Sequence, residues 1–137
     1  MDQDLQASMI EYYTHRASEF DKKYKGYRPL SILDPRTNEH EVKILSETVK
    51  ASCDGVLLDM ACGTAFWLPH YAGNCSHITL FDQSEEMLSH ARDRADSLGI
   101  INQTDLVLGD ALSYQFRENR FDTVLVAFLI SHFTDDQ

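Results

Sequence analysis

The sequence predicts an α/β fold built on a doubly wound parallel sheet. Four short apolar runs between residues 56 and 128 are typical of strands that are buried on both faces. Segments with helical or turn character separate these runs. Strands that alternate with helices at this spacing indicate β–α–β units, and such units place their strands parallel in one sheet.

The four predicted strands differ in length, and the last is the longest and most hydrophobic. They span residues 56–60, 77–82, 106–108 and 121–128. A helix is expected after the first strand, from about Thr64 to about Tyr71. Another follows Ser84, which occupies an N-cap position, and Gly99 ends it.

Two further helices are predicted before the first strand. Apolar and aromatic residues recur at helical spacing across residues 4–24, and a second helix carries Val42 and Val49 on one face. We expect residues 1–38 to form a helical lid or cap. Residues 39–137 would then form the α/β domain.

Composition narrows the class of protein. The chain has 137 residues, and 12 basic side chains against 22 acidic ones give a net charge of −10. A nucleic-acid substrate is therefore disfavoured, because binding to phosphates needs a basic surface. Three cysteines without a C-x-x-C pair favour a reduced, cytoplasmic protein with buried thiols over a disulfide framework or a zinc site. No apolar run is long enough to span a membrane, and the acidic N-terminus does not support a signal peptide.

The ends of the first three strands carry the residues that are candidates for ligand binding. Ligands of such sheets bind outside the carboxyl ends of the strands. Asp59 precedes a turn of small residues in which Gly63 tolerates dihedral angles that side chains forbid, so the backbone can approach a ligand closely. The free N–H groups of the next helix would face the same ligand. Asp82 suits the vicinal hydroxyls of a ribose, and Asp110 could accept a hydrogen bond from an exocyclic amine.

Four segments carry short motifs in a characteristic order. The first reads V-L-L-D-M-A-C-G-T-A at residues 56–65, and the second reads F-D-Q-S-E-E-M-L at residues 81–88. The third is G-D-A at residues 109–111, and the fourth runs from the last predicted strand to S-H-F-T-D at residues 131–135. Together they resemble the class I S-adenosylmethionine-dependent methyltransferases, which implies a Rossmann-like fold. The N-terminal residues 12–20 are similar to the lid helix of members that act on small molecules. Because the family's core has seven strands, the chain corresponds to its N-terminal half, strands 1–4.

The resemblance implies a binding site for S-adenosylmethionine as cofactor. The residues it implicates are Tyr13, Arg16, Asp59, Ala61, Cys62, Gly63, Asp82, Gln83, Met87, Asp110, Ala111, Ala127 and Phe128. Asp59, Ala61 and Gly63 would line the methionine part. Asp82 would bind the ribose, and Gln83 and Met87 would lie against the ribose and adenine. Asp110 and Ala111 would meet the adenine edge, and the end of the fourth strand would approach the methionine amino group. Tyr13 and Arg16 would close over the cofactor, and no metal is expected.

Several of these residues also have ordinary structural explanations. Tyr12, Tyr13 and Phe20 could pack in a core rather than form a lid, and Cys62 could simply fill space. His132 is the candidate for a general base, since the ordinary pKa of histidine suits proton abstraction. A lone histidine behind a strand is usually structural, so the catalytic residue is left unassigned.

Methyl transfer from S-adenosylmethionine to a small-molecule acceptor is the leading functional hypothesis. A NAD-dependent oxidoreductase would share the fold, but its G-x-G-x-x-G fingerprint is not met, because Phe66 stands where the third glycine belongs. A truncated, non-catalytic chain that binds the cofactor or self-associates is the other alternative. The fourth strand would then leave an apolar edge that could pair with a second copy in a homodimer.

Overall fold

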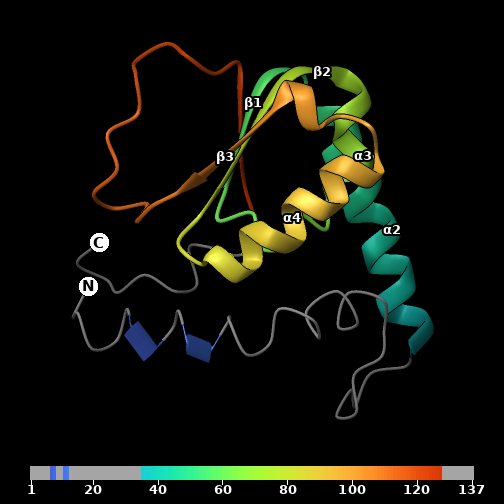
Figure 1. Ribbon diagram of the computed structural model, residues 1–137. Helices are drawn as coiled ribbons and strands as arrows, with labels where there is room; N and C mark the ends of the chain where they lie inside the picture. Colours follow the sequence, from blue (N-terminus) through green and yellow to red (C-terminus); the bar gives the residue numbers. More distant parts are fainter. Residues whose placement is uncertain (1–6, 9–10, 13–34, 128–137) are drawn as a thin grey trace.

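The computed structural model describes residues 7–8, 11–12 and 35–127. Its centre is a four-stranded sheet in the order β3-β2-β1-β4, and all neighbouring strands are parallel (Figure 1). The strands are β1 (Gly55–Met60), β2 (Cys75–Asp82), β3 (Thr104–Leu108) and β4 (Thr123–Val126). The predicted parallel α/β sheet is therefore confirmed.

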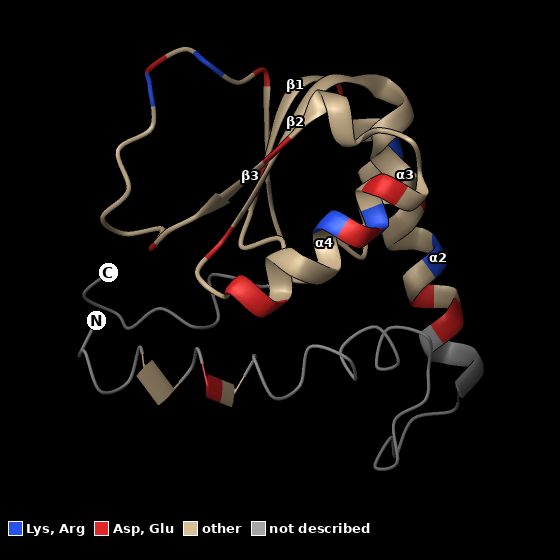
Figure 2. Cartoon of the chain, in the orientation of Figure 1, with Lys and Arg blue, Asp and Glu red and all other residues tan. Residues whose placement is uncertain are grey.

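Helices cover one face of this sheet, and two of them carry many of the charged residues. The helices are α2 (Pro35–Ser52), α3 (Leu68–Tyr71) and α4 (Glu85–Ser97), with short 3-10 turns η1 (Ala72–Asn74) and η2 (Ile101–Gln103). Helix α4 packs against β2 and β3, and α2 packs against α3. Figure 2 shows charged residues on α2, α4 and the loop between β3 and β4, whereas the strands consist largely of other residue types.

The hydrophobic core lies between one face of the sheet and the helices. Leu57 of β1 pairs with Ile78 of β2, so both side chains lie on the same face. Both are buried together with Tyr71 of α3 and Ala91 of α4. Burying a side chain the size of leucine contributes about 1.5–3 kcal/mol, so these contacts hold the helices to the face that also carries Asp59.

Helix α4 begins and ends where the sequence predicts. The Oγ atom of Ser84 accepts a hydrogen bond from the backbone N–H of Met87 at 3.3 Å, which caps the first turn. Gly99 adopts a φ of 72°, a left-handed conformation that stops the helix. The capping interaction fixes the start of α4 directly after β2.

The predicted start of the helix after β1 is wrong. Helix α3 begins at Leu68 rather than at Thr64. Ala61, Gly63 and Ala65 adopt left-handed φ values of 55°, 57° and 56°, which a right-handed helix cannot contain. The chain therefore makes successive turns over residues 61–67, and exposed helix N–H groups do not lie where the sequence placed them.

The predicted limits of the fourth strand are also wrong within the described residues. Strand β4 begins at Thr123 rather than at residue 121 and ends at Val126. Asp122 forms a bend in which its carboxylate accepts from the N–H of Val56 at 2.8 Å and its own N–H donates to the Val56 carbonyl at 2.8 Å. Gly55 leaves room for this carboxylate, since an added Cβ would lie 2.5 Å from it. These bonds join the amino ends of β1 and β4.

The N-terminal expectations fall mostly outside the described residues. Residues 7–8 and 11–12 are helical, and the rest of the predicted helix over 4–24 is not described. The expected boundary after residue 38 falls inside α2, and the division into lid and domain stays a prediction. Among the described helices, none combines the length and the apolar character needed to cross a membrane.

Candidate cofactor site

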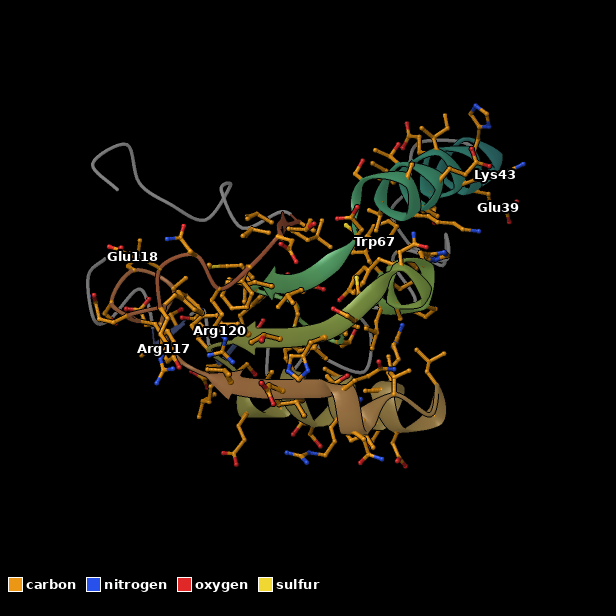
Figure 3. All side chains as sticks on the ribbon, turned by 90° about the horizontal axis from the view of Figure 1, so that it is seen from above. Glu39, Lys43, Trp67, Arg117, Glu118 and Arg120 are labelled. Atoms are coloured by element: carbon orange, nitrogen blue, oxygen red, sulfur yellow. The ribbon has the colours of Figure 1, made fainter. Side chains whose placement is uncertain are left out.

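The carboxyl ends of the four strands meet at one edge of the sheet. Met60 of β1 lies opposite Phe81 of β2 and Val126 of β4, and Asp82 lies opposite Leu108 of β3. In Figure 3 the strand arrows point toward the side where Arg117 and Glu118 lie, away from Glu39 and Lys43 of α2. The segments that follow the strands therefore share this edge, as expected for a ligand site of a parallel sheet.

Asp82 links the turn after β1 to the start of α4. One carboxylate oxygen accepts from the N–H of Gly63 at 2.9 Å, and the other accepts from the N–H of Ser84 at 2.9 Å. The side chain is 8% exposed, and its burial raises the pKa, although the N–H groups of Ser84, Gly63 and Gln83 act in the opposite direction. The hydrogen bonds from Gly63 and Ser84 leave acceptor capacity on the carboxylate, part of which the N–H of Gln83 takes up. The carboxylate of Asp82 at the end of β2 is thus held in a fixed orientation and can still accept a hydrogen bond from a ligand.

Backbone bonds tie the neighbouring strand ends to β2. The N–H of Cys62 donates to the Phe81 carbonyl at 3.0 Å, and the N–H of Gly109 donates to the Asp82 carbonyl at 3.0 Å. A Cβ added to Gly63 would lie 4.0 Å from the Met87 sulfur. The structure therefore brings together Gly63 of the first predicted motif and Asp82 and Met87 of the second.

Asp59 is held differently, because it lies inside β1 rather than in the turn. It is 2% exposed, and one carboxylate oxygen accepts from the hydroxyl of Tyr71 at 2.7 Å. Burial raises the pKa of Asp59 to about 7; the negative charge of Asp82 adds to this rise, and the hydroxyl of Tyr71 opposes it. Burial and the neighbouring Asp59 likewise raise the pKa of Tyr71 well above its ordinary value. At neutral pH the Asp59 carboxyl is poised between its protonated and ionised forms.

Tyr71 is a partner of this site that was not predicted from the sequence. The sequence predicted this tyrosine only as the end of a helix that began at Thr64. In the structure the turns at residues 61–67 delay the start of α3 to Leu68. Since the face of α3 that meets β1 depends on these turns, no local signal could have paired Tyr71 with Asp59.

Asp110 stabilises its own turn after β3. Its carboxylate oxygens accept from the N–H of Leu112 at 3.1 Å and from the hydroxyl of Ser113 at 3.1 Å. This pattern is typical of an aspartate that begins a turn. Gly109 comes directly before it and allows Phe81 and the ring of Tyr114 to pack closely, since an added Cβ would lie 2.9 Å from both rings. Asp110 is only half-buried and makes no hydrogen bond to Asp82.

Cys62 lies in the turn with its thiol directed to the backbone. Its Sγ donates to the Gly63 carbonyl at 3.4 Å. Burial raises the thiol pKa well above its ordinary value, and the negative charges of Asp59 and Asp82 add to the rise. A thiol with a raised pKa is a poor nucleophile, so this environment favours the space-filling explanation.

The remaining predicted residues divide into two groups. Ala61, Gln83, Ala111 and Ala127 are half-buried next to the strand ends. Four others fall outside the described residues, namely Tyr13, Arg16, Phe128 and His132. Within the described part of the chain, no group of histidine, cysteine and acidic side chains is arranged to hold a metal ion.

Comparison with known proteins identifies the family. Residues 57–137 match a family described as a methyltransferase domain. A demethylmenaquinone methyltransferase of Bacillus licheniformis is 28% identical over 120 residues, which are 85% of this chain and 50% of that protein. The ubiquinone/menaquinone biosynthesis C-methyltransferase UbiE of Roseobacter denitrificans is 38% identical over 84 residues, which are 59% of this chain and 33% of that protein.

A solved structure shows the same fold over nearly the whole chain. The complex described as DhpI-SAM-HEP superposes with a TM-score of 0.73 at 24% identity, and the match covers 99% of this chain and 56% of that one. The chain thus spans between one third and just over one half of the length of these proteins. The residues matched by the family, 57–137, include β2, β3, β4 and most of β1, together with the turns that follow the first three strands. The chain belongs to the methyltransferase-domain family.

Proposed function

We propose that this chain is the cofactor-binding part of an S-adenosylmethionine-dependent methyltransferase. The observation that carries the proposal is the carboxylate of Asp82, held by the amides of Gly63 and Ser84 at the end of β2. Its free lone pairs can accept from the two hydroxyls of a ribose. The solved complex DhpI-SAM-HEP, which by its name contains SAM, has the same fold and is consistent with this proposal.

With the ribose at Asp82, the other parts of the cofactor are assigned to the neighbouring residues. The backbone at Ala61 and Gly63, beside the thiol of Cys62, would line the methionine part. Gln83 and Met87 would contact the ribose and the adenine. The adenine edge would then reach Asp110 and Ala111, whose turn is joined to β2 by the Gly109 amide. These positions form a continuous path along the ends of β1, β2 and β3.

Further contributions are proposed for the methionine end. Asp59, which lies beneath the turn after β1, would face the positive charge at the methionine end of the cofactor. The backbone of Ala127 and Phe128 would approach the amino group, and Tyr13 and Arg16 would close over the cofactor. Bound S-adenosylmethionine supplies an electrophilic methyl group on its sulfonium, so the protein's task is to align the acceptor and exclude water.

The acceptor is proposed to be a small molecule. The relatives named as demethylmenaquinone and ubiquinone/menaquinone methyltransferases act on quinone-type compounds by their names. The net charge of −10 also disfavours an acceptor made of nucleic acid. A cytoplasmic location, inferred from the unpaired cysteines, remains part of this proposal.

Calorimetry with the purified chain tests cofactor binding directly. We expect S-adenosylmethionine and its demethylated product to bind and NADH not to bind. Replacing Asp82 with alanine should weaken binding by about 1.5–3 kcal/mol, the usual contribution of hydrogen bonds to a charged group. Asp93→Ala, an exposed acid on α4, serves as the matched control. Failure of both sulfur nucleosides to bind would refute the proposal, and an unchanged affinity in Asp82→Ala would remove Asp82 from the site.

Self-association through β4 is a second candidate property. Strand β4 is an edge of the described sheet, and its Val124 and Val126 are 53% and 41% exposed. An apolar edge strand can pair with the same strand of a second copy. Light scattering after size exclusion would show a homodimer, and a stable monomer at high concentration would count against pairing.

A further inference from the structure

Beneath the turn after β1 lies a buried pair formed by Asp59 and Tyr71. The hydroxyl–carboxylate distance is 2.7 Å, and both side chains are almost completely buried. Within the part of the chain that the structure describes, no lysine or arginine pairs with Asp59. A buried carboxylate without a cation has a high cost of ionisation. Among the contacts described for Asp59, the hydroxyl of Tyr71 is therefore the group that favours its charged form.

We propose that Tyr71 is a positioning residue, whose hydroxyl fixes the Asp59 carboxyl as the group that meets the positive charge of S-adenosylmethionine. The inference rests on the proposed function. The cofactor carries one more positive charge than its demethylated product, because the sulfonium becomes a neutral thioether when the methyl group leaves. A carboxylate fixed near the methionine end therefore distinguishes cofactor from product by charge.

The groups that face Asp59 determine how binding depends on pH. Tyr71 comes from α3, Asp82 from β2 and Cys62 from the turn, and Cys53 lies at the entry to β1. The neighbours of Asp59 in the sheet are Leu80 and Leu125, which are uncharged. Burial raises the pKa of Asp59 to about 7, close to neutrality, and burial also raises the pKa of Asp82.

The proposal makes a specific prediction for the wild-type chain. As the pH rises from about 6 to about 8, Asp59 loses its proton, and the affinity for the cationic cofactor should increase. The affinity for the demethylated product, whose sulfur is a neutral thioether, should increase less over the same range. In Asp59→Asn the side chain keeps an oxygen that can accept from Tyr71, but the side chain cannot ionise. This variant should therefore flatten the pH dependence of the affinity for both the cofactor and the product.

Tyr71→Phe is the decisive variant, because it keeps the buried ring and removes only the hydroxyl. The hydroxyl of Tyr71 lowers the pKa of Asp59, so its loss should move the midpoint of the cofactor profile to higher pH. Affinity for S-adenosylmethionine near pH 7 should fall roughly three- to tenfold, the range of one hydrogen bond, and should recover at higher pH. Tyr114→Phe, which changes a 41% exposed tyrosine on the loop after β3, is the matched control and should leave the profile unchanged.

Calorimetric titration of the full chain with both nucleosides at several pH values separates the outcomes, with thermal denaturation checking that each variant is folded. An upward shift of the midpoint in Tyr71→Phe supports the proposal. Equal weakening at every pH would show a merely structural role and overturn it, as would an unchanged profile. If Tyr71→Phe does not fold, Asp59→Asn decides, and a pH profile that stays steep in that variant overturns the proposal. Failure of the wild-type chain to bind either nucleoside would instead refute the proposed function.

Discussion

Replacing Asp59 with asparagine should stabilise the fold, and the gain should depend on pH. The ordinary pKa of an aspartate is 3.8, whereas burial raises that of Asp59 to about 7. Between these values the native state retains a proton that the unfolded chain has lost, so the free energy of unfolding falls as the pH rises. Above about pH 7 both states are ionised, and the loss is complete.

The size of this effect follows from the interval between the two pKa values. At about 1.36 kcal/mol per pH unit, the full interval corresponds to about 4 kcal/mol. Asparagine is neutral at every pH and still offers an oxygen to the hydroxyl of Tyr71. Relative to wild type, the gain in Asp59→Asn near pH 8 should exceed the gain near pH 5.5 by about 2 kcal/mol.

Urea denaturation followed by circular dichroism at these two pH values measures the difference. Asp93→Asn removes an exposed acid from α4 and should produce the same small change at both. A stability gain in Asp59→Asn that is equal at both pH values would refute the assigned ionisation behaviour of Asp59. A net loss at both values would show that the second carboxylate oxygen has a donor that the amide nitrogen cannot replace.

Substitutions at three further positions test the local structure around the site by denaturation midpoints. Gly109→Ala should destabilise by about 1–3 kcal/mol, because the new Cβ would press on the rings of Phe81 and Tyr114; an unchanged midpoint would mean that both rings can yield. Ala61→Gly should stabilise by about 0.5–1 kcal/mol, since relief of the left-handed strain outweighs the added freedom of the unfolded chain, and a loss would contradict the φ of 55°. Ser84→Ala should cost about 1 kcal/mol by removing the cap of α4, whereas Ser84→Thr should keep most of the stability.

The elements that the sequence predicted well depend on local patterns. Apolar runs placed all four strands, and the N-cap Ser84 with the terminating Gly99 placed α4. These signals are short-range, because side-chain periodicity and capping involve neighbouring residues in the chain. The limits of β4 and the start of α3 were predicted wrongly, since the first depends on a bond between Asp122 and β1 and the second on three left-handed residues.

The sequence by itself determined the parallel sheet, the order of its motifs and the acidic residues at the strand ends. Only the tertiary structure decided what each acid does. The carboxylate of Asp82 accepts hydrogen bonds from two backbone amides. The carboxylate of Asp110 accepts within its own turn, and that of Asp59 accepts from the hydroxyl of Tyr71. These partners depend on the register of β1 against β2 and on the left-handed dihedral angles of residues 61–65, which set the path of the chain from β1 to α3. Because such contacts join segments that are distant in the chain, no local pattern of residues encodes them.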